Sequence, residues 1–67
     1  MTEQERKDIE NAMQDFKSNI EHIEGDVKQG AWDELSAAMS ITSYRIAIRA
    51  LRRWLDEDRE DREHDEA

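Results

Sequence analysis

The chain offers few side chains that could do chemistry. It has two histidines, His22 and His64, and no cysteine. His22 lacks a second soft ligand one helical turn further on, and His64 lies among the acids of the C-terminal segment, where we expect no more than weak adventitious contact with a metal ion. Serine, histidine and aspartate nowhere take the spacing of a nucleophile with its base. With two glycines in all, the chain also has no glycine-rich phosphate loop. We therefore expect a protein that is not an enzyme and that binds no metal ion and no cofactor.

Four arginines are the most informative charged residues. They lie in segment 35–55, which contains no acid, and they are Arg45, Arg49, Arg52 and Arg53. The first three share one face of a helix, and a guanidinium group matches the geometry of a phosphate. The four arginines are therefore candidate phosphate contacts.

The acidic segments on either side favour a different role for the arginines. Residues 1–34 and residues 56–67 each have a net charge of −6, against +4 for residues 35–55. These acids would largely cancel the field of the arginines, so we expect ion pairs within the chain rather than contact with nucleic acid. A turn near Gly30 places Arg45 near Phe16, and it places Arg52 near Ile9. The acids then within reach are Glu5, Asp8, Glu10 and Asp15.

Apolar residues predict a first helix over about residues 2–28. They recur at spacings of four and three, the seam of a helix that packs against another helix, at Ile9, Met13, Phe16, Ile20, Ile23 and Val27. Thr2 and Glu5 fit a capping box, in which each side chain accepts a free backbone N–H of the first turn. Gly30 is the expected break, because glycine readily takes the positive φ that follows a helix end.

A second helix is predicted over about residues 33–56, with Asp33 as its N-cap. Its apolar residues cover well over half of the helix circumference, which is more than one partner helix can bury. They are Leu35, Ala38, Met39, Ile41, Tyr44, Ile46, Ala47, Ile48, Ala50, Leu51, Trp54 and Leu55. The predicted core of the hairpin is Ile9, Phe16, Ile20, Ile23, Ile41, Ile48, Leu51 and Leu55.

The expected fold is all-α, with a two-helix antiparallel hairpin over residues 1–56 that dimerises into a four-helix bundle with the second helix central. A hairpin of this size buries too little apolar surface to be stable alone. The predicted subunit interface is Met39, Ile46, Ala47, Ala50 and Trp54. Small side chains would let the two central helices approach closely, at Ala37, Ala38, Ala47 and Ala50. Trp32, Tyr44 and Trp54 are interpreted as core or interface anchors rather than as platforms for stacked bases.

Residues 57–67 are predicted to be an acidic C-terminal tail. Acid at the end of a helix opposes the helix dipole, so we expect this tail to fray into solvent, with one i,i+4 ion pair between Asp58 and Arg62. The alternative is a charged surface that binds a basic partner or imitates a phosphate backbone.

Composition narrows the class of protein further. The absence of cysteine excludes a disulfide scaffold, and no apolar run reaches the length of about 18 residues that a membrane span needs. No charged and then apolar leader begins the sequence, so we expect a cytoplasmic protein. The net charge of −8 disfavours binding to an anionic membrane or non-specifically to nucleic acid.

One segment of the second helix resembles a known kind of protein. Residues 43–51, Ser-Tyr-Arg-Ile-Ala-Ile-Arg-Ala-Leu, resemble the Ala-Ile-x-Ala-Leu helix that closes many short uncharacterised proteins of bacterial prophages and mobile elements. This resemblance implies a setting and no activity. The plan of a cysteine-free hairpin that dimerises is similar to the ROP-type bundle, which binds RNA, and this likeness is one of architecture.

Two functions from different classes follow. The first, which we favour, is a homo-oligomeric interaction or adaptor module that presents an acidic outer surface to another protein. The alternative is a regulator linked to nucleic acid. It would either contact RNA or DNA through the arginines or act as an acidic mimic of DNA that inhibits a DNA-binding protein.

Overall fold

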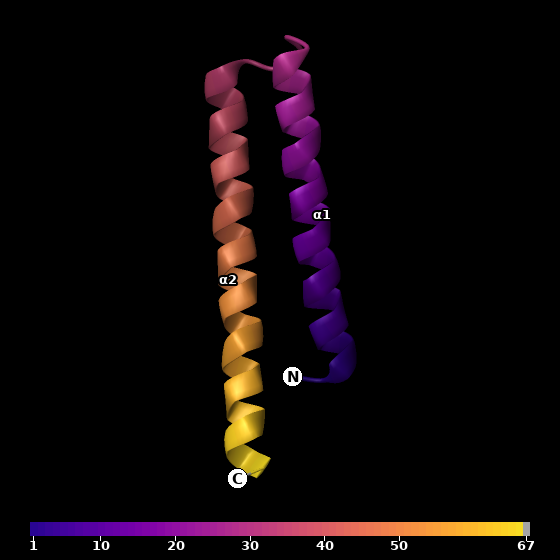
Figure 1. The fold of residues 1–67 in the computed structure, drawn as a ribbon, viewed down its shortest axis with the longest axis vertical. Coiled ribbons are helices and arrows are strands. Elements are labelled where there is room, and N and C mark those ends of the chain that lie inside the picture. Colours follow the sequence, from indigo (N-terminus) through magenta and orange to yellow (C-terminus); the bar gives the residue numbers. More distant parts are fainter. Residues whose placement is uncertain (67) are drawn as a thin grey trace.

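Two antiparallel helices make up the chain in the computed structural model (Figure 1). Helix α1 spans Glu3–Lys28 and helix α2 spans Glu34–Glu66. The structure describes the backbone of residues 1–66 and the side chains of residues 1–60. The predicted all-α hairpin is confirmed. Within this described part, neither helix contains an apolar stretch of the length that a bilayer requires.

Helix α1 begins at the predicted capping box. The backbone N–H of Glu5 donates to Oγ1 of Thr2 at 3.1 Å, and the backbone N–H of Thr2 donates to Oε1 of Glu5 at 3.2 Å. Both N–H groups lie in the first turn and have no helical partner of their own. The hydrogen bond that the Thr2 backbone donates, followed by one from the Thr2 side chain, lowers the pKa of the Glu5 carboxyl, because both favour its charged form.

The turn between the helices uses one glycine and one aspartate, as predicted. Gly30 has a φ of 78°, in the left-handed region that favours glycine, and its N–H donates to the carbonyl of Val27 at 3.1 Å. Asp33 then caps α2, because its Oδ2 accepts from both the backbone N–H and the hydroxyl of Ser36, at 3.1 and 3.2 Å. Glycine therefore ends the first helical segment and aspartate begins the second.

The core between the two helices is narrow. Its buried side chains are Ile9, Met13, Ile23, Ala37 and Leu55. Five other residues predicted for the core are half-buried: Phe16, Ile20, Ile41, Ile48 and Leu51. The ring centroids of Phe16 and Tyr44 lie 5.5 Å apart, which confirms the register that a turn near Gly30 predicts. Two helices alone enclose little volume, so most core residues keep part of their surface in water.

Ala37 corrects one of the packing predictions. It is the most buried residue of the core, at 2% exposed, whereas the sequence placed it between two copies of the second helix. Ala37 lies in line with Ile41, Tyr44 and Ile48, on the side of α2 that faces α1. Ala37 therefore lets α1 and α2 of one chain approach each other and takes no part in an outer face.

Helix α2 extends to Glu66, well past its predicted end at residue 56. Asp58 lies beyond that end and is half-buried against α1. It forms ion pairs with the N-terminal ammonium of Met1 at 3.2 Å and with Nη1 of Arg6 at 3.4 Å. These contacts bind the extension of α2 to the start of α1, which the local sequence does not reveal. The predicted pair of Asp58 with Arg62 lies outside the described side chains.

Candidate functional site

The two sides of α2 differ in exposure. The side turned towards α1 carries residues four and three apart that are buried or half-buried, namely Ala37, Ile41, Tyr44, Ile48, Leu51 and Leu55. The outward side carries large apolar side chains that remain in water. Leu35 is 70% exposed, Met39 66%, Ile46 59% and Trp54 53%. We call these four residues and the exposed Ala50 the outer stripe.

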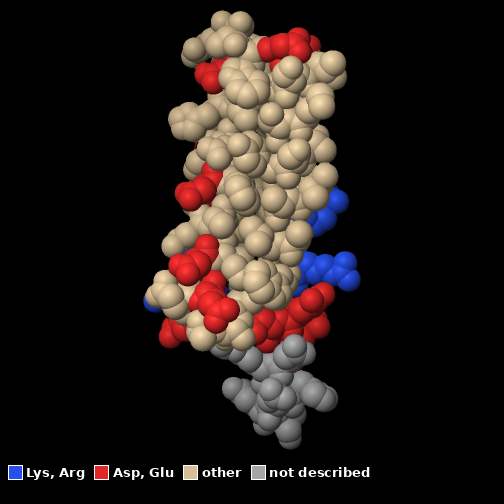
Figure 2. Space-filling view, turned by 180° about the vertical axis from the view of Figure 1, so that it is seen from behind, with Lys and Arg blue, Asp and Glu red and all other residues tan. Residues whose placement is uncertain are grey.

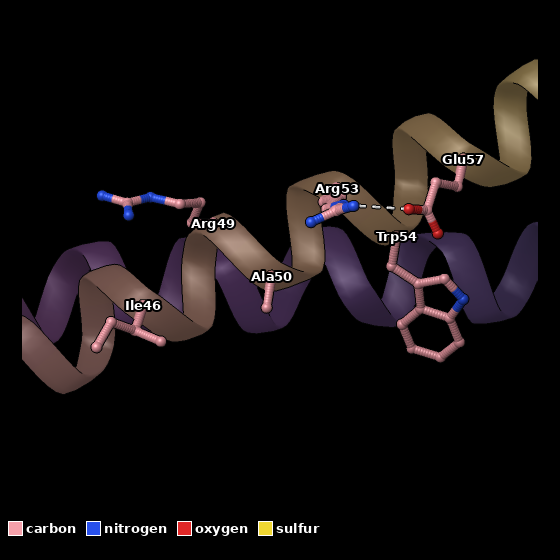
Figure 3. A pocket seen from close by; sticks show the side chains of 6 residues that line it. All are labelled: Ile46, Arg49, Ala50, Arg53, Trp54 and Glu57. Atoms are coloured by element: carbon pink, nitrogen blue, oxygen red, sulfur yellow. Dashed lines mark hydrogen bonds and ion pairs between the residues drawn. The ribbon is translucent and has the colours of Figure 1, made fainter.

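The outer stripe is hollowed at Ala50, as Figure 3 shows. Ile46, Ala50 and Trp54 follow one another at one-turn intervals and point to the same side of α2. Because Ala50 is small, a shallow depression of about 370 Å³ forms here. Arg49 and Arg53 border the depression and project away from the apolar side chains. The site is thus an open apolar surface with charged groups at its edge.

One broad face of the hairpin is poor in charge. Figure 2 shows this face, with uncharged side chains over most of its area and charged groups mainly along its edges and towards the lower end. A surface of this kind can be covered by another protein without burying an unpaired charge, which would cost several kcal/mol. It therefore suits a protein interface better than a site for a small polar ligand.

Four of the five residues predicted for the subunit interface are exposed. Met39, Ile46, Ala50 and Trp54 are exposed on the outward side of α2, whereas Ala47 is half-buried and lies nearer to α1. Leu35 was not assigned to the interface, although it is the most exposed of the large apolar residues. Its spacing of four residues from Met39 is the signal that would have found it.

The arginines pair differently from the prediction. Nη2 of Arg45 lies 3.8 Å from Oε1 of Glu24, a residue outside the predicted set of acids. That predicted set was Glu5, Asp8, Glu10 and Asp15. Glu10, Lys17 and Glu24 follow one edge of α1 at seven-residue intervals, so the residue nearest in register to Arg45 is a lysine. Arg45 therefore reaches past it to the next acid.

The other three arginines make no ion pair with α1. Nε of Arg53 donates to Oε1 of Glu57 at 3.2 Å, one turn further along α2. Within residues 1–60, Arg49 and Arg52 form no ion pair. Glu10 is one of the two acids next to Ile9, the predicted position of Arg52, and its Oε1 instead lies 4.0 Å from Nε of Arg6. The prediction that the arginines neutralise the acids of α1 is therefore wrong for Arg49, Arg52 and Arg53.

The described side chains contain no grouping suited to hold a metal ion, since no three histidine, cysteine, aspartate or glutamate side chains gather there. His22 is exposed on α1. The side chain of His64, the second histidine considered, lies outside the described part. A second shallow depression, lined by Val27, Ala37 and Ile41 among others, lies near the turn and is likewise open to solvent.

Fold and site together define an all-α helical hairpin with an exposed apolar surface on its second helix. Comparisons of the chain with protein-family models, with curated proteins and with solved structures find no match. The resemblance of residues 43–51 to short proteins of prophages and mobile elements stays a prediction.

Proposed function

We propose that this protein is a non-enzymatic interaction module that self-associates through the outer stripe of α2 and presents its acidic surface to another protein. The observation that carries the proposal is the exposure of four large apolar side chains in helical register on one side of α2. Removing apolar surface from water contributes about 25 cal/mol per Å². The outer stripe is therefore the part of the surface that gains most from being covered.

The accessible surface of the chain supports this proposal. It amounts to 5431 Å² for a mass of 8.0 kDa. Compact monomers of that mass expose about 4,450 Å², so this chain exposes roughly 1,000 Å² more. A stable protein interface buries about 800 Å² on each partner. The excess surface is thus of the size that one subunit contact removes.

The test is the solution mass by light scattering over a concentration series, with helicity measured by circular dichroism at each concentration. We expect a dimer that loses helicity on dilution, because folding of the hairpin is coupled to assembly. The variant Ile46→Glu should raise the dissociation constant of the dimer, so that the dimer forms only at much higher protein concentration. Gln14→Glu adds the same charge on the exposed side of α1 and serves as its control. A fully helical monomer at every concentration would contradict the proposal.

A second candidate function is contact with nucleic acid through Arg49 and Arg52, which have no acid partner among residues 1–60. Guanidinium groups without a carboxylate partner are available for phosphate. This function requires retention on heparin that weakens with salt and is lost in the double variant Arg49→Ala/Arg52→Ala. An acidic mimic of DNA would instead pass through heparin and compete with DNA for a basic protein.

A further inference from the structure

We propose that the outer stripes of two copies of this chain pair antiparallel, about a two-fold axis that passes between Tyr44 and Arg45. This inference rests on the proposed function, self-association through the outer stripe, and adds the orientation and the register of the two copies. The occupant is a second copy of the chain, so the interface is isologous and each residue contact occurs twice.

The outer stripe, together with Ser43, forms two short rows of residues on α2. Residues four apart on a helix lie one above the other on its surface, so each row forms a ridge. The first row is Leu35, Met39 and Ser43, and the second row is Ile46, Ala50 and Trp54. The first row has its small residue at the end nearest the middle of the stripe. The second row has its small residue in the centre, where the depression lies.

These rows are complementary when they run antiparallel. Leu35 then lies opposite Trp54 of the second copy. Met39 lies opposite Ala50 of the second copy, where the depression has room for a long flexible side chain. Ile46 lies opposite Ser43. Large residues thus face small ones at two of the three levels, which is the alternation that close packing requires.

Ser43 can be buried at such an interface at little cost in free energy. Its hydroxyl donates to the backbone carbonyl of Met39 at 3.1 Å, within α2. A hydroxyl with its donor already used loses little when water is removed, whereas an unpaired one costs about 1–3 kcal/mol. The only polar side chain among the six residues of the two rows therefore does not oppose their pairing.

Other registers leave large apolar groups badly placed. A parallel arrangement faces each residue with its own copy, so that Ile46 meets Ile46 and Ala50 meets Ala50, which leaves a void beside a clash. An antiparallel axis at Ala50 places Met39 and Leu35 opposite the acidic segment that follows residue 60. With the two-fold axis near the middle of the outer stripe, every residue of the stripe faces an apolar or small residue of the second copy.

The test uses disulfide formation, since the natural chain has no cysteine. In the double variant Met39→Cys/Ala50→Cys the two sulfurs of one chain are about 16 Å apart along the helix. A disulfide needs Cα atoms within roughly 7 Å, so this variant can only link two chains. We expect a covalent dimer as the main product on mild oxidation. Neither single variant should form one, because neither residue lies opposite its own copy.

The double variant Lys7→Cys/Glu21→Cys is the control. It places two thiols on the exposed surface of α1 and gives the rate at which disulfides form between chains that collide at random. Single variants that link as well as the double variant would overturn the antiparallel register. A third outcome is that Met39→Cys/Ala50→Cys forms disulfides no faster than this control while light scattering still shows a dimer. That result would overturn the register but not the proposed function. A monomer by light scattering would overturn both. Should the first pair disturb folding, Leu35→Cys/Trp54→Cys tests the same register.

Discussion

At the scale of single residues, the starts of both helices rest on side chains that replace a missing backbone partner. Thr2 and Glu5 exchange hydrogen bonds at the start of α1, and Asp33 accepts two from Ser36 at the start of α2. Such contacts depend only on residues within one turn. They therefore act in the same way whether or not the chain assembles.

The variant Thr2→Ala removes the side-chain half of the capping box. We expect the free energy of unfolding to fall by about 1 kcal/mol, the usual cost of losing an N-cap hydroxyl. Urea unfolding followed by circular dichroism measures this change. Thr42→Ala removes an exposed threonine inside α2 and should be neutral or slightly stabilising. Equal losses in the two variants would contradict the role of the cap.

The lowered pKa of Glu5 makes stability depend on pH. A carboxyl whose pKa is lower in the folded chain stabilises the fold above its unfolded pKa, and this contribution disappears as the pH falls through the folded value. Glu5→Gln keeps an acceptor for the Thr2 N–H but cannot titrate. We expect its urea midpoint to fall less than that of the natural chain between neutral and acid pH. Parallel curves for both proteins would refute the assignment.

At the scale of the elements, α2 is held to α1 both by its apolar inner side and by charge at its far end. Ile48 and Leu51 pack against the cluster of Ile9, Met13 and Leu55. Beyond this cluster, Asp58 connects α2 to the first turns of α1. The two kinds of contact predict different responses to substitution.

Ile48→Asp places a charge against the apolar cluster, where it has no partner. We expect the chain to lose both its helicity and its assembly, since a buried unpaired charge costs more than a small hairpin can supply. Far-UV circular dichroism and light scattering follow the two losses. Asn11→Asp adds the same charge at an exposed position of α1 and should remain folded. Full helicity in Ile48→Asp would show that the inner side is wrongly assigned.

Asp58→Asn weakens the ion pairs with Arg6 and the Met1 ammonium while keeping the shape of the side chain. We expect a loss of about 1 kcal/mol in the free energy of unfolding, the upper end for partly exposed pairs. Faster amide hydrogen exchange should accompany it after residue 56 of α2. Asp56→Asn changes an exposed carboxylate on the same turn and is the control. If the two variants exchange equally fast, Asp58 does not hold the end of α2.

At the scale of the whole molecule, charge opposes the association that the apolar surface favours. Each copy carries a net charge of −8, so two copies repel at long range. Assembly therefore has to overcome this long-range repulsion.

Added salt separates the two candidate functions. Sodium chloride screens like charges, with a Debye length of about 10 Å at 0.1 M, so we expect the Kd of the dimer to fall as salt rises. Contact with nucleic acid through the arginines would instead weaken with salt, because counterions compete for the phosphates. Sedimentation equilibrium at low and high salt measures the first effect. A dimer that dissociates as salt rises would show that ion pairs, and not the outer stripe, hold it together.

Features that depend on local contacts could be predicted from the sequence. The capping box, the glycine with positive φ and the cap at Asp33 were all predictable, because each depends on residues within a few positions. The spacing of apolar residues also predicted the antiparallel hairpin. With the turn placed at Gly30, chain geometry brings Phe16 level with Tyr44, as the ring contact confirms.

The partners of residues that are distant in the sequence could not be predicted and are known from the folded hairpin. Arg45 pairs with Glu24 and Asp58 pairs with Arg6 because long side chains choose among several charges within reach, and sequence spacing does not rank those charges. Ala37 is buried inside the hairpin while Ala50 is exposed, although both belong to one apolar helix. Which alanine faces α1 depends on the rotation of α2 about its own axis, and that rotation is fixed by packing along the whole hairpin.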